Sequence, residues 1–205
     1  MAELSLTALL TLDGVMQAPG GPNEDVEGGF PYGGWAFPHF DADIGNIMDD
    51  IFLRAHAFLL GRRTYDIFAA YWPRIPNEGN PVAEKLNTLP KYVATRSQAS
   101  FEWHASMPVH DVVHEVTALK AEHEGEIQVH GSIDLAQTLM GYDLIDEYRL
   151  LIFPVTLGQG KRLFERGTLP ATFSLHHSSI TSAGVMYCAY RRAGALQTGS
   201  FELPE

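Results

Sequence analysis

Residues 57–72 read AFLLGRRTYDIFAAYW, and this stretch decides the fold class. A short apolar run at residues 57–60 ends at Gly61 and is typical of a buried strand. Residues 64–72 have the character of a helix, which Pro73 would stop. A strand that leads through a glycine turn into a helix is the repeating unit of an α/β protein, so this stretch predicts that class.

The same alternation extends in both directions. A helix over residues 41–55 is predicted because its apolar residues recur at helical spacing: Ile44, Ile47, Met48, Ile51 and Phe52. Further strands are predicted at residues 4–12, 92–95, 127–130 and 147–154, and further helices at 110–123 and 133–140, with a short helix around 82–86. Strands at 171–178 and 184–192 flank a short polar segment, as in an antiparallel hairpin. The order predicts one domain over residues 1–205, with a mostly parallel central sheet, flanking helices and an antiparallel C-terminal edge hairpin.

Composition and net charge exclude some classes of binding partner. The chain has 205 residues, of which 45% are apolar, and a formal net charge of -11. That charge disfavours duplex nucleic acid and acidic membranes, and no stretch approaches the roughly 20 apolar residues that a membrane span needs. The residues after Met1 do not resemble a signal peptide, and the histidines and the single cysteine lack metal-ligand spacing. We therefore expect a cytoplasmic protein without a metal site.

Three turns, each after a predicted strand, carry residues suited to a nucleotide with phosphates. The first, Gly61-Arg62-Arg63-Thr64, places two guanidinium groups at a helix N-terminus, where phosphate binds readily. The second, Thr95-Arg96-Ser97, suits a ribose 2′-phosphate, because one charge-assisted hydrogen bond of roughly 1.5–3 kcal/mol is enough to prefer NADPH to NADH. The third, His130-Gly131-Ser132, has a glycine that lets the backbone approach a pyrophosphate, and its serine would cap the helix that follows.

Each turn taken alone is also compatible with an ordinary polar turn, and the G-x-G-x-x-G fingerprint is absent from the sequence. Three such turns in the same topological position are stronger together, because strand ends share one edge of an α/β sheet. They also supply the local positive charge that an acidic protein needs for an anionic cofactor. The sequence therefore predicts a nucleotide site at this edge.

The segment from Asp13 to Phe40 is rich in glycine and proline and too long for an ordinary connector. Long segments of this kind are usually functional or partly disordered. Asp13 follows the first strand, where a ligand would meet it, although a plain turn explains it equally well. Asp41 begins the helix over 41–55, where capping is the default interpretation.

The order of these motifs resembles the dihydrofolate reductase superfamily, in the branch that contains the reductase domain of the bacterial riboflavin-biosynthesis enzyme. The likeness spans about residues 4–192. The matching stretches are TLDG at 11–14, LLGRRTY at 59–65, KYVATRS at 91–97, VHGS at 129–132, LIDEYRL at 144–150 and FPVTLGQGKRLF at 153–164. Single stretches are unspecific, but their order and spacing are specific.

The resemblance implies a sheet of about eight strands, NADPH across its carboxyl edge and a homodimer. In such proteins the turns matching the three above hold the cofactor, and the third continues into the helix. This extension adds three residues to the predicted cofactor set: Ile133, Asp134 and Leu135. The loop that starts at Leu12-Asp13-Gly14 lies over the nicotinamide and the substrate in this family, and Trp35 would then be a wall residue of the substrate cavity.

Two departures bear on the substrate. Dihydrofolate reductases place a carboxylate on the helix before the GRRT-like strand, and counting back from Gly61 reaches Gly45 here, with Asp41 close but displaced. They also place an arginine where this chain has Pro90. No zinc deaminase motif precedes the reductase motifs in this chain. Folate is therefore the least favoured of the substrates considered.

The resulting hypothesis is an NADPH-dependent reductase that transfers hydride to a small heterocyclic, carbonyl or imine substrate. Asp13 and Asp41 are the candidate proton donors. The alternatives are an aminopyrimidine reductase of the riboflavin pathway and a dihydrofolate reductase. Outside the enzymes, the alternative is an NADP(H)-sensing module, which would need no second cavity beside the nicotinamide.

Overall fold

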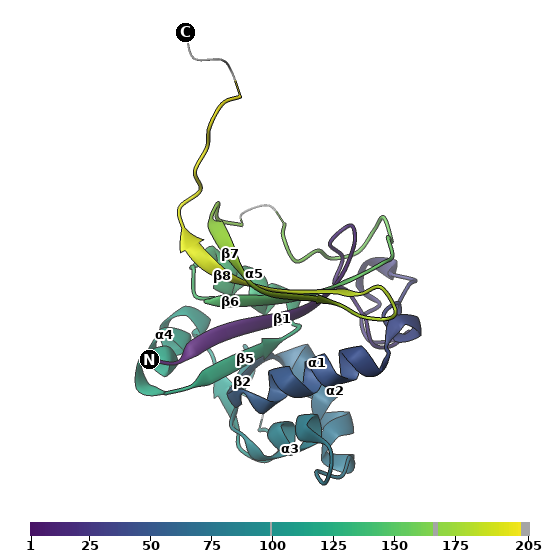
Figure 1. Ribbon diagram of the computed structural model, residues 1–205. Coiled ribbons are helices and arrows are strands. Elements are labelled where there is room, and N and C mark those ends of the chain that lie inside the picture. Colours follow the sequence, from purple (N-terminus) through teal and green to yellow (C-terminus); the bar gives the residue numbers. More distant parts are fainter. Residues whose placement is uncertain (99, 166–167, 202–205) are drawn as a thin grey trace.

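The computed structural model describes residues 1–98, 100–165 and 168–201, and its centre is one eight-stranded sheet (Figure 1). The strand order is β4-β3-β2-β5-β1-β6-β8-β7. From β4 to β6 the neighbouring strands are parallel, whereas β8 and β7 run antiparallel to their neighbours. The strands are β1 (Glu3–Thr11), β2 (Ala55–Gly61), β3 (Lys91–Ala94), β4 (Ser106–Val109), β5 (Glu126–His130), β6 (Glu147–Phe153), β7 (Thr172–Ile180) and β8 (Met186–Gly194).

Helices connect the parallel strands and cover the sheet. They are α1 (Ala42–Leu53), α2 (Arg62–Tyr71), α3 (Pro81–Thr88), α4 (Val112–Glu122) and α5 (Ile133–Gly141), with short 3-10 turns at Glu27–Gly29, Phe37–His39 and Trp72–Arg74. Side-chain oxygens cap three of these helices by accepting a backbone N–H of the first turn, from Asp41 in α1, Asn80 in α3 and Asp111 in α4. No helix in the described ranges is long and apolar enough to cross a membrane.

Two apolar clusters form the core, and strand alternation assigns them to opposite faces of the sheet. On β1, Leu4 and Leu6 belong to the first cluster, which also contains apolar residues of α4 and α5. Leu9 packs against the second cluster, which contains apolar residues of α1, α2 and α3. The second face also carries polar residues along β1, β5 and β6, and these position part of the site described below.

The predicted fold class is confirmed, and most predicted elements lie within a few residues of the observed ones. The prediction missed β4 as a strand. This strand has four residues, includes Pro108 and lies at one edge of the sheet, where Met107 is exposed. Proline is tolerated at such an edge, but a short run with proline and without buried alternation gives no strand signal in the sequence.

Candidate functional site

The three predicted cofactor turns lie side by side. β3, β2 and β5 are neighbours in the sheet and run parallel, so their carboxyl ends reach the same edge. A cavity of about 1940 Å³ opens at this edge. Every residue of the predicted cofactor set lines it: Gly61, Arg62, Arg63, Thr64, Thr95, Arg96, Ser97, Gly131, Ser132, Ile133, Asp134 and Leu135.

The turn after β5 is bonded to the turn after β2. Ser132 Oγ accepts the backbone N–H of Gly61 at 2.9 Å and lies 2.6 Å from the hydroxyl of Thr64. The expected helix cap is therefore wrong, because the Ser132 side chain bonds across the sheet edge and not to the first turn of α5. The first N–H groups of α5 are left without a side-chain cap beside the cavity, which suits an anion.

The backbone also approaches the cavity closely at two glycines. A Cβ at Gly61 would lie 2.5 Å from Ser132 Oγ, so no other residue fits there without displacing the serine. Gly131 and Ser132 both have a positive φ, 62° and 63°. Glycine adopts this conformation freely, whereas serine is strained in it.

The three arginines of the turns are in different electrostatic states. Arg62 pairs with Asp66 at 2.9 Å, and Arg63 pairs with Asp25 at 2.7 Å. Arg96 is exposed and forms no ion pair with any residue in the described ranges. An incoming anion would have to compete with a carboxylate at Arg62 and Arg63, whereas the charge of Arg96 is available at once.

A cluster around Asp25 ties the long loop to the rest of the site. Lys161 Nζ lies 2.9 Å from Asp25 and 2.6 Å from Glu27, and Arg63 binds Asp25 from the other side. Burial raises the pKa of Asp25, but the hydrogen bond and charge of Lys161, with the charge of Arg63, outweigh it and lower the pKa overall. Asp25 is therefore an ionised anchor that joins the segment 13–40 to α2 and to the loop after β6.

Beyond the turns, the floor of the cavity consists of β1, α1 and the end of β5. Thr7 and Leu9 contribute from β1, and Gly45, Met48, Asp49 and Phe52 contribute from α1. His130 closes this part and stacks on Phe52, with the ring centroids 4.3 Å apart and the planes 17° apart. Burial, supported by the nearby Arg149 charge, lowers the pKa of His130 to about 3, although Glu126 opposes the shift.

The predicted proton donors lie outside this lining. Asp13 accepts hydrogen bonds from the hydroxyl of Thr11 at 2.6 Å and from the backbone N–H groups of Leu157 and Gly158. The Thr11 bond is the largest cause that lowers the pKa of Asp13 to about 2; burial opposes it, and the two backbone bonds add to the lowering. A carboxylate so strongly held in its ionised form is poorly suited to donate a proton, so the geometry favours a role in fastening two loops.

Asp41 is also held in place by backbone N–H groups. Its side chain caps α1 through the N–H of Ile44 and accepts the N–H of Ala183. The Ile44 bond is the largest cause that lowers the pKa of Asp41, and burial opposes it. The capping interpretation is therefore confirmed. The structure offers no support for Asp41 as a proton donor.

The predicted substrate residues Leu12, Gly14 and Trp35 also lie outside the cavity lining. Leu12 is exposed, Gly14 forms a turn with a φ of 78°, and Trp35 is buried with its indole N–H bonded to the carbonyl of Gln17. The long loop does line the cavity, but through other residues: Met16, Ala18, Pro19, Gly20, Glu24, Ala36, Phe37 and Phe40.

One loop carboxyl group has the environment of an acid. Glu24 lines the cavity, and its Oε2 accepts the backbone N–H groups of Gly20 at 2.6 Å and Gly21 at 3.0 Å. Burial raises the pKa of Glu24, and the two backbone bonds only partly offset that effect. The sequence carried no signal for Glu24, because the loop conformation alone decides which of its carboxylates faces the cavity.

Sequence reasoning also missed Thr7, and it named His130 only as the first residue of the third turn, without a role for its side chain. Both occupy positions of buried strands where alternation points the side chain to the face that α1 covers. A polar residue at a buried strand position is unusual, so the presence of threonine and histidine there is the sequence feature that could have identified them as candidate site residues.

Comparison with known proteins places the chain in a family. The profile of the RibD C-terminal domain family matches residues 2–187, and the chain belongs to this family. It is 29% identical over 197 residues to the uncharacterized protein YyaP of Bacillus subtilis (strain 168), which covers 94% of this chain and 96% of YyaP.

Solved structures share the fold at lower identity. A pyrimidine reductase-like protein from Corynebacterium diphtheriae is 13% identical, with a TM-score of 0.63, over 94% of this chain and 92% of the other. A dihydrofolate reductase from Enterococcus faecalis, complexed with NADP(H) and RAB-propyl, is 15% identical with a TM-score of 0.58, over 93% and 96% of the two chains. These likenesses support the dihydrofolate-reductase-like fold that the sequence predicted.

Proposed function

We propose that this protein is an NADPH-dependent reductase that transfers hydride to a small heterocyclic, carbonyl or imine substrate. The observation that carries the proposal is the convergence of three turns, 61–64, 95–97 and 131–135, on one cavity. Membership of the RibD C-terminal domain family supports it, as does the shared fold with a dihydrofolate reductase that binds NADP(H).

The residues present fit a dinucleotide with phosphates. The free N–H groups at the start of α5 and the glycines at 61 and 131 suit a pyrophosphate, which needs close backbone approach. Arg96, with Thr95 and Ser97 beside it, suits a 2′-phosphate because its charge has no described partner. A cavity of about 1940 Å³ exceeds the roughly 300–1,000 Å³ typical of a single small-molecule site, so it has room for cofactor and substrate together.

Bound NADPH would supply a hydride, and the chain must supply orientation and a proton. Residues of β1 and α1 on the cavity floor would orient the acceptor at the end of the site away from Arg96. Glu24 is the candidate to deliver the proton, because it lines the cavity, burial favours its protonated form and Oε1 makes no hydrogen bond within the described ranges. Glu24→Gln should therefore keep NADPH binding and lose reduction of any substrate that the parent protein reduces.

Paired calorimetric titrations with NADPH and NADH test the cofactor. We expect NADPH to bind about tenfold or more tightly than NADH, and Arg96→Ala to remove most of that difference. Arg74→Ala is the matched control, because Arg74 is exposed but lies outside the cavity. The absence of binding by either nucleotide would overturn the proposal.

Among possible substrates, an aminopyrimidine is the second candidate. The family and the shared fold with a pyrimidine reductase-like protein favour it. Dihydrofolate ranks third, because Gly45 has no side chain at the position that carries a carboxylate in the resembled dihydrofolate reductases, and the α1 carboxylate that lines the cavity, Asp49, lies one turn further on. A sensor module is less favoured than an enzyme, since the long loop and α1 wall a second region of the cavity that a sensor does not need.

We also propose that two copies of the chain associate through β7. This strand is outermost in the sheet and leaves one row of backbone N–H and C=O groups without a partner strand. Its side chains include Leu175 and Ile180, which are 54% and 74% exposed. An antiparallel pairing of β7 with the β7 of a second copy would satisfy that row and cover both side chains, as a twofold interface does.

A further inference from the structure

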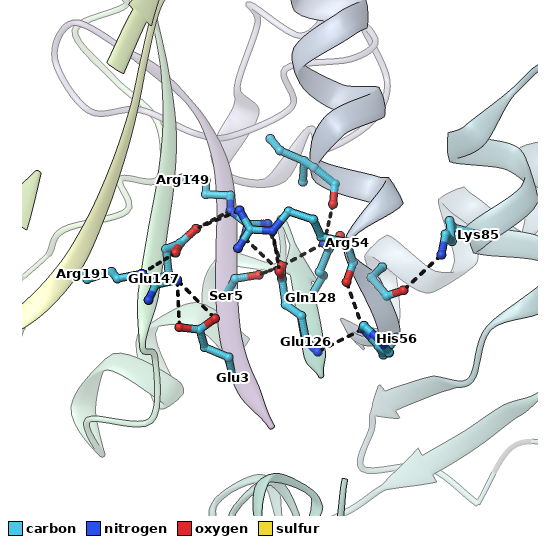
Figure 2. A network of polar contacts seen from close by, with 12 residues as sticks. Glu3, Ser5, Arg54, His56, Lys85, Glu126, Gln128, Glu147, Arg149 and Arg191 are labelled. Atoms are coloured by element: carbon cyan, nitrogen blue, oxygen red, sulfur yellow. Dashed lines mark hydrogen bonds and ion pairs between the residues drawn. The ribbon is translucent and has the colours of Figure 1, made fainter. Parts of the chain in front are cut away.

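A buried ion network lies on the face of the sheet that α1 covers, and Figure 2 shows it. The guanidinium of Arg149 is fully buried and lies 2.6 and 3.0 Å from the two carboxylate oxygens of Glu126. Burial raises the pKa of Glu126, but its bond to Arg149 and the Arg149 charge outweigh burial and lower the pKa overall. Glu126 is therefore an ionised acceptor in the interior of the protein.

This acceptor fixes the orientation of the Gln128 side chain. Gln128 Nε2 donates to the carbonyl of Ile51 at 2.6 Å and to Glu126 Oε1 at 2.8 Å. A carbonyl and an ionised carboxylate can only accept, so the amide nitrogen must face them. Gln128 Oε1 consequently faces the other way, 2.9 Å from Nε2 of His130.

The tautomer of His130 follows from that contact. Because Gln128 Oε1 is an acceptor, Nε2 of His130 must carry a proton. With a pKa of about 3 the imidazole is neutral near pH 7, so Nδ1 carries none. Within the described ranges nothing donates to Nδ1, and the ring lines the cavity with one face on Phe52. His130 thus presents an unused lone pair at the cavity floor.

Thr7 provides a second unused group beside it. Thr7 and His130 are register partners on adjacent strands, and both line the cavity. Thr7 is 2% exposed, and its hydroxyl has no hydrogen-bond partner among the residues that the structure describes. Buried hydroxyls are rarely left unpaired, because leaving one unpaired destabilises the fold. An unpaired hydroxyl beside an unpaired imidazole nitrogen indicates a ligand that bonds to both.

We propose that Nδ1 of His130 and the hydroxyl of Thr7 form the recognition pair for the substrate, and that they select an uncharged molecule with an N–H or O–H donor. A neutral imidazole lone pair matches the N–H edge of a neutral heterocycle, and the carboxylate of Asp49, which lines the same floor from α1, accepts from the same kind of donor. Gln128 is the positioning residue that holds the tautomer. The inference rests on the proposed function, because it assumes that the hydride acceptor occupies this end of the cavity.

The tautomer is tested first, without any ligand. The chain has nine histidines, so ¹⁵N-histidine NMR needs an assignment, which the loss of one signal set in His130→Gln provides. We expect a neutral ring protonated at Nε2 throughout the range near neutral pH. A ring protonated at Nδ1, or a cationic ring, would overturn the proposal.

Recognition is tested with two probes that share one ring. Uracil carries two N–H donors, and 1,3-dimethyluracil carries none. Both without nucleotide and in the presence of excess NADP⁺, we expect uracil to shift the Nδ1 signal of His130 and to bind about tenfold or more tightly than 1,3-dimethyluracil. Equal binding of the two probes, or no shift of His130 with either, would overturn the recognition pair.

A third measurement separates recognition from folding. Thr7→Val removes an unpaired hydroxyl and keeps the shape, so we expect it to raise the thermal midpoint of unfolding while weakening uracil binding. Thr181→Val is the matched control, because the buried Thr181 hydroxyl accepts the N–H of Val185 and its loss should lower the midpoint. A lowered midpoint in Thr7→Val would assign the hydroxyl a structural role and contradict the proposal.

These outcomes are distinguishable from failure of the reductase proposal. If neither nucleotide binds but uracil still shifts His130, the recognition pair stands and the cofactor assignment fails. If NADPH binds with its expected preference and His130 responds to neither probe, the cofactor assignment stands and the recognition pair fails.

Discussion

Ser132 Oγ lies 2.9 Å from the backbone nitrogen of Gly61, so the turn after β5 is bonded to the turn after β2. The two residues are 71 positions apart in the chain. Gly61 lacks the Cβ that would meet Ser132, and Ser132 adopts a positive φ to reach Gly61. Each residue therefore depends on the identity of the other, and this dependence can be measured.

Gly61→Ala should lower the free energy of unfolding by about 1–3 kcal/mol, the usual range for an overpacked site. The added Cβ would lie 2.5 Å from Oγ and 2.7 Å from Cβ of Ser132. Adding Ser132→Gly should recover most of the loss, since the nearest remaining Ser132 atom lies 3.8 Å away. Urea unfolding of the two variants is the measurement. A double variant no more stable than Gly61→Ala would contradict this account.

Asp13→Asn should lower the free energy of unfolding by about 1–2 kcal/mol at pH 7, allowing for the partial exposure of the side chain. The folded pKa of about 2 lies below that of an unfolded aspartate, so ionised Asp13 stabilises the fold above about pH 4. That contribution is lost as the pH falls toward 2. Urea unfolding from pH 7 to pH 3 should therefore show that the free energies of unfolding of the parent protein and of Asp13→Asn become more alike as the pH falls. A difference that does not change with pH would contradict the assignment.

Arg149→Met should lower the free energy of unfolding by about 3–5 kcal/mol, because it removes the only buried cation beside two buried carboxylates among the described residues and leaves them the half-exposed Arg54 as their shared partner. Those carboxylates belong to Glu126 and Glu147, which are 5% and 1% exposed. Arg191→Ala is the matched control, because its partly exposed guanidinium also binds Glu147 but should contribute only about 1 kcal/mol or less. Chemical unfolding compares the two, and equal losses would be inconsistent with the buried network as described.

Leu175→Asp should convert a dimer into a monomer, since it places a charge at the centre of the proposed β7 interface. Sedimentation velocity over a range of protein concentrations is the measurement. Leu196→Asp is the control, because Leu196 is 56% exposed but follows the end of β8. A parent protein that sediments as a monomer would rule out this interface.

Local patterns were sufficient for the fold class and for the three turns that line the cavity. The helix at Ala42–Leu53 followed from apolar spacing, and the turn at Gly61 followed from an apolar run that ends in glycine and arginine. Such signals are contained within about ten neighbouring residues, where periodicity and turn chemistry act. The three turns could be placed together because parallel strands share their carboxyl edge.

Contacts between distant segments could not be predicted in the same way. The Asp13 carboxylate accepts the backbone N–H groups of Leu157 and Gly158, more than 140 positions away. Its hydrogen bonds and its lowered pKa therefore depend in part on a loop that no local sequence pattern relates to it. The role of His130 likewise depends on Gln128 and, through it, on the buried charges of Glu126 and Arg149. These properties arise only when the sheet brings the strands into register.

The ion pair between Arg63 and Asp25 links a predicted phosphate turn to the long loop, and this link predicts an order of ligand binding. Arg63 belongs to a predicted phosphate turn, and Asp25 anchors the long loop that walls the substrate end. A phosphate that draws Arg63 away leaves Asp25 with Lys161 as its remaining cationic partner among the described residues. Under the proposed function, a cofactor phosphate bound to Arg63 would weaken the attachment of the loop at Asp25, so we expect the cofactor to bind before the substrate.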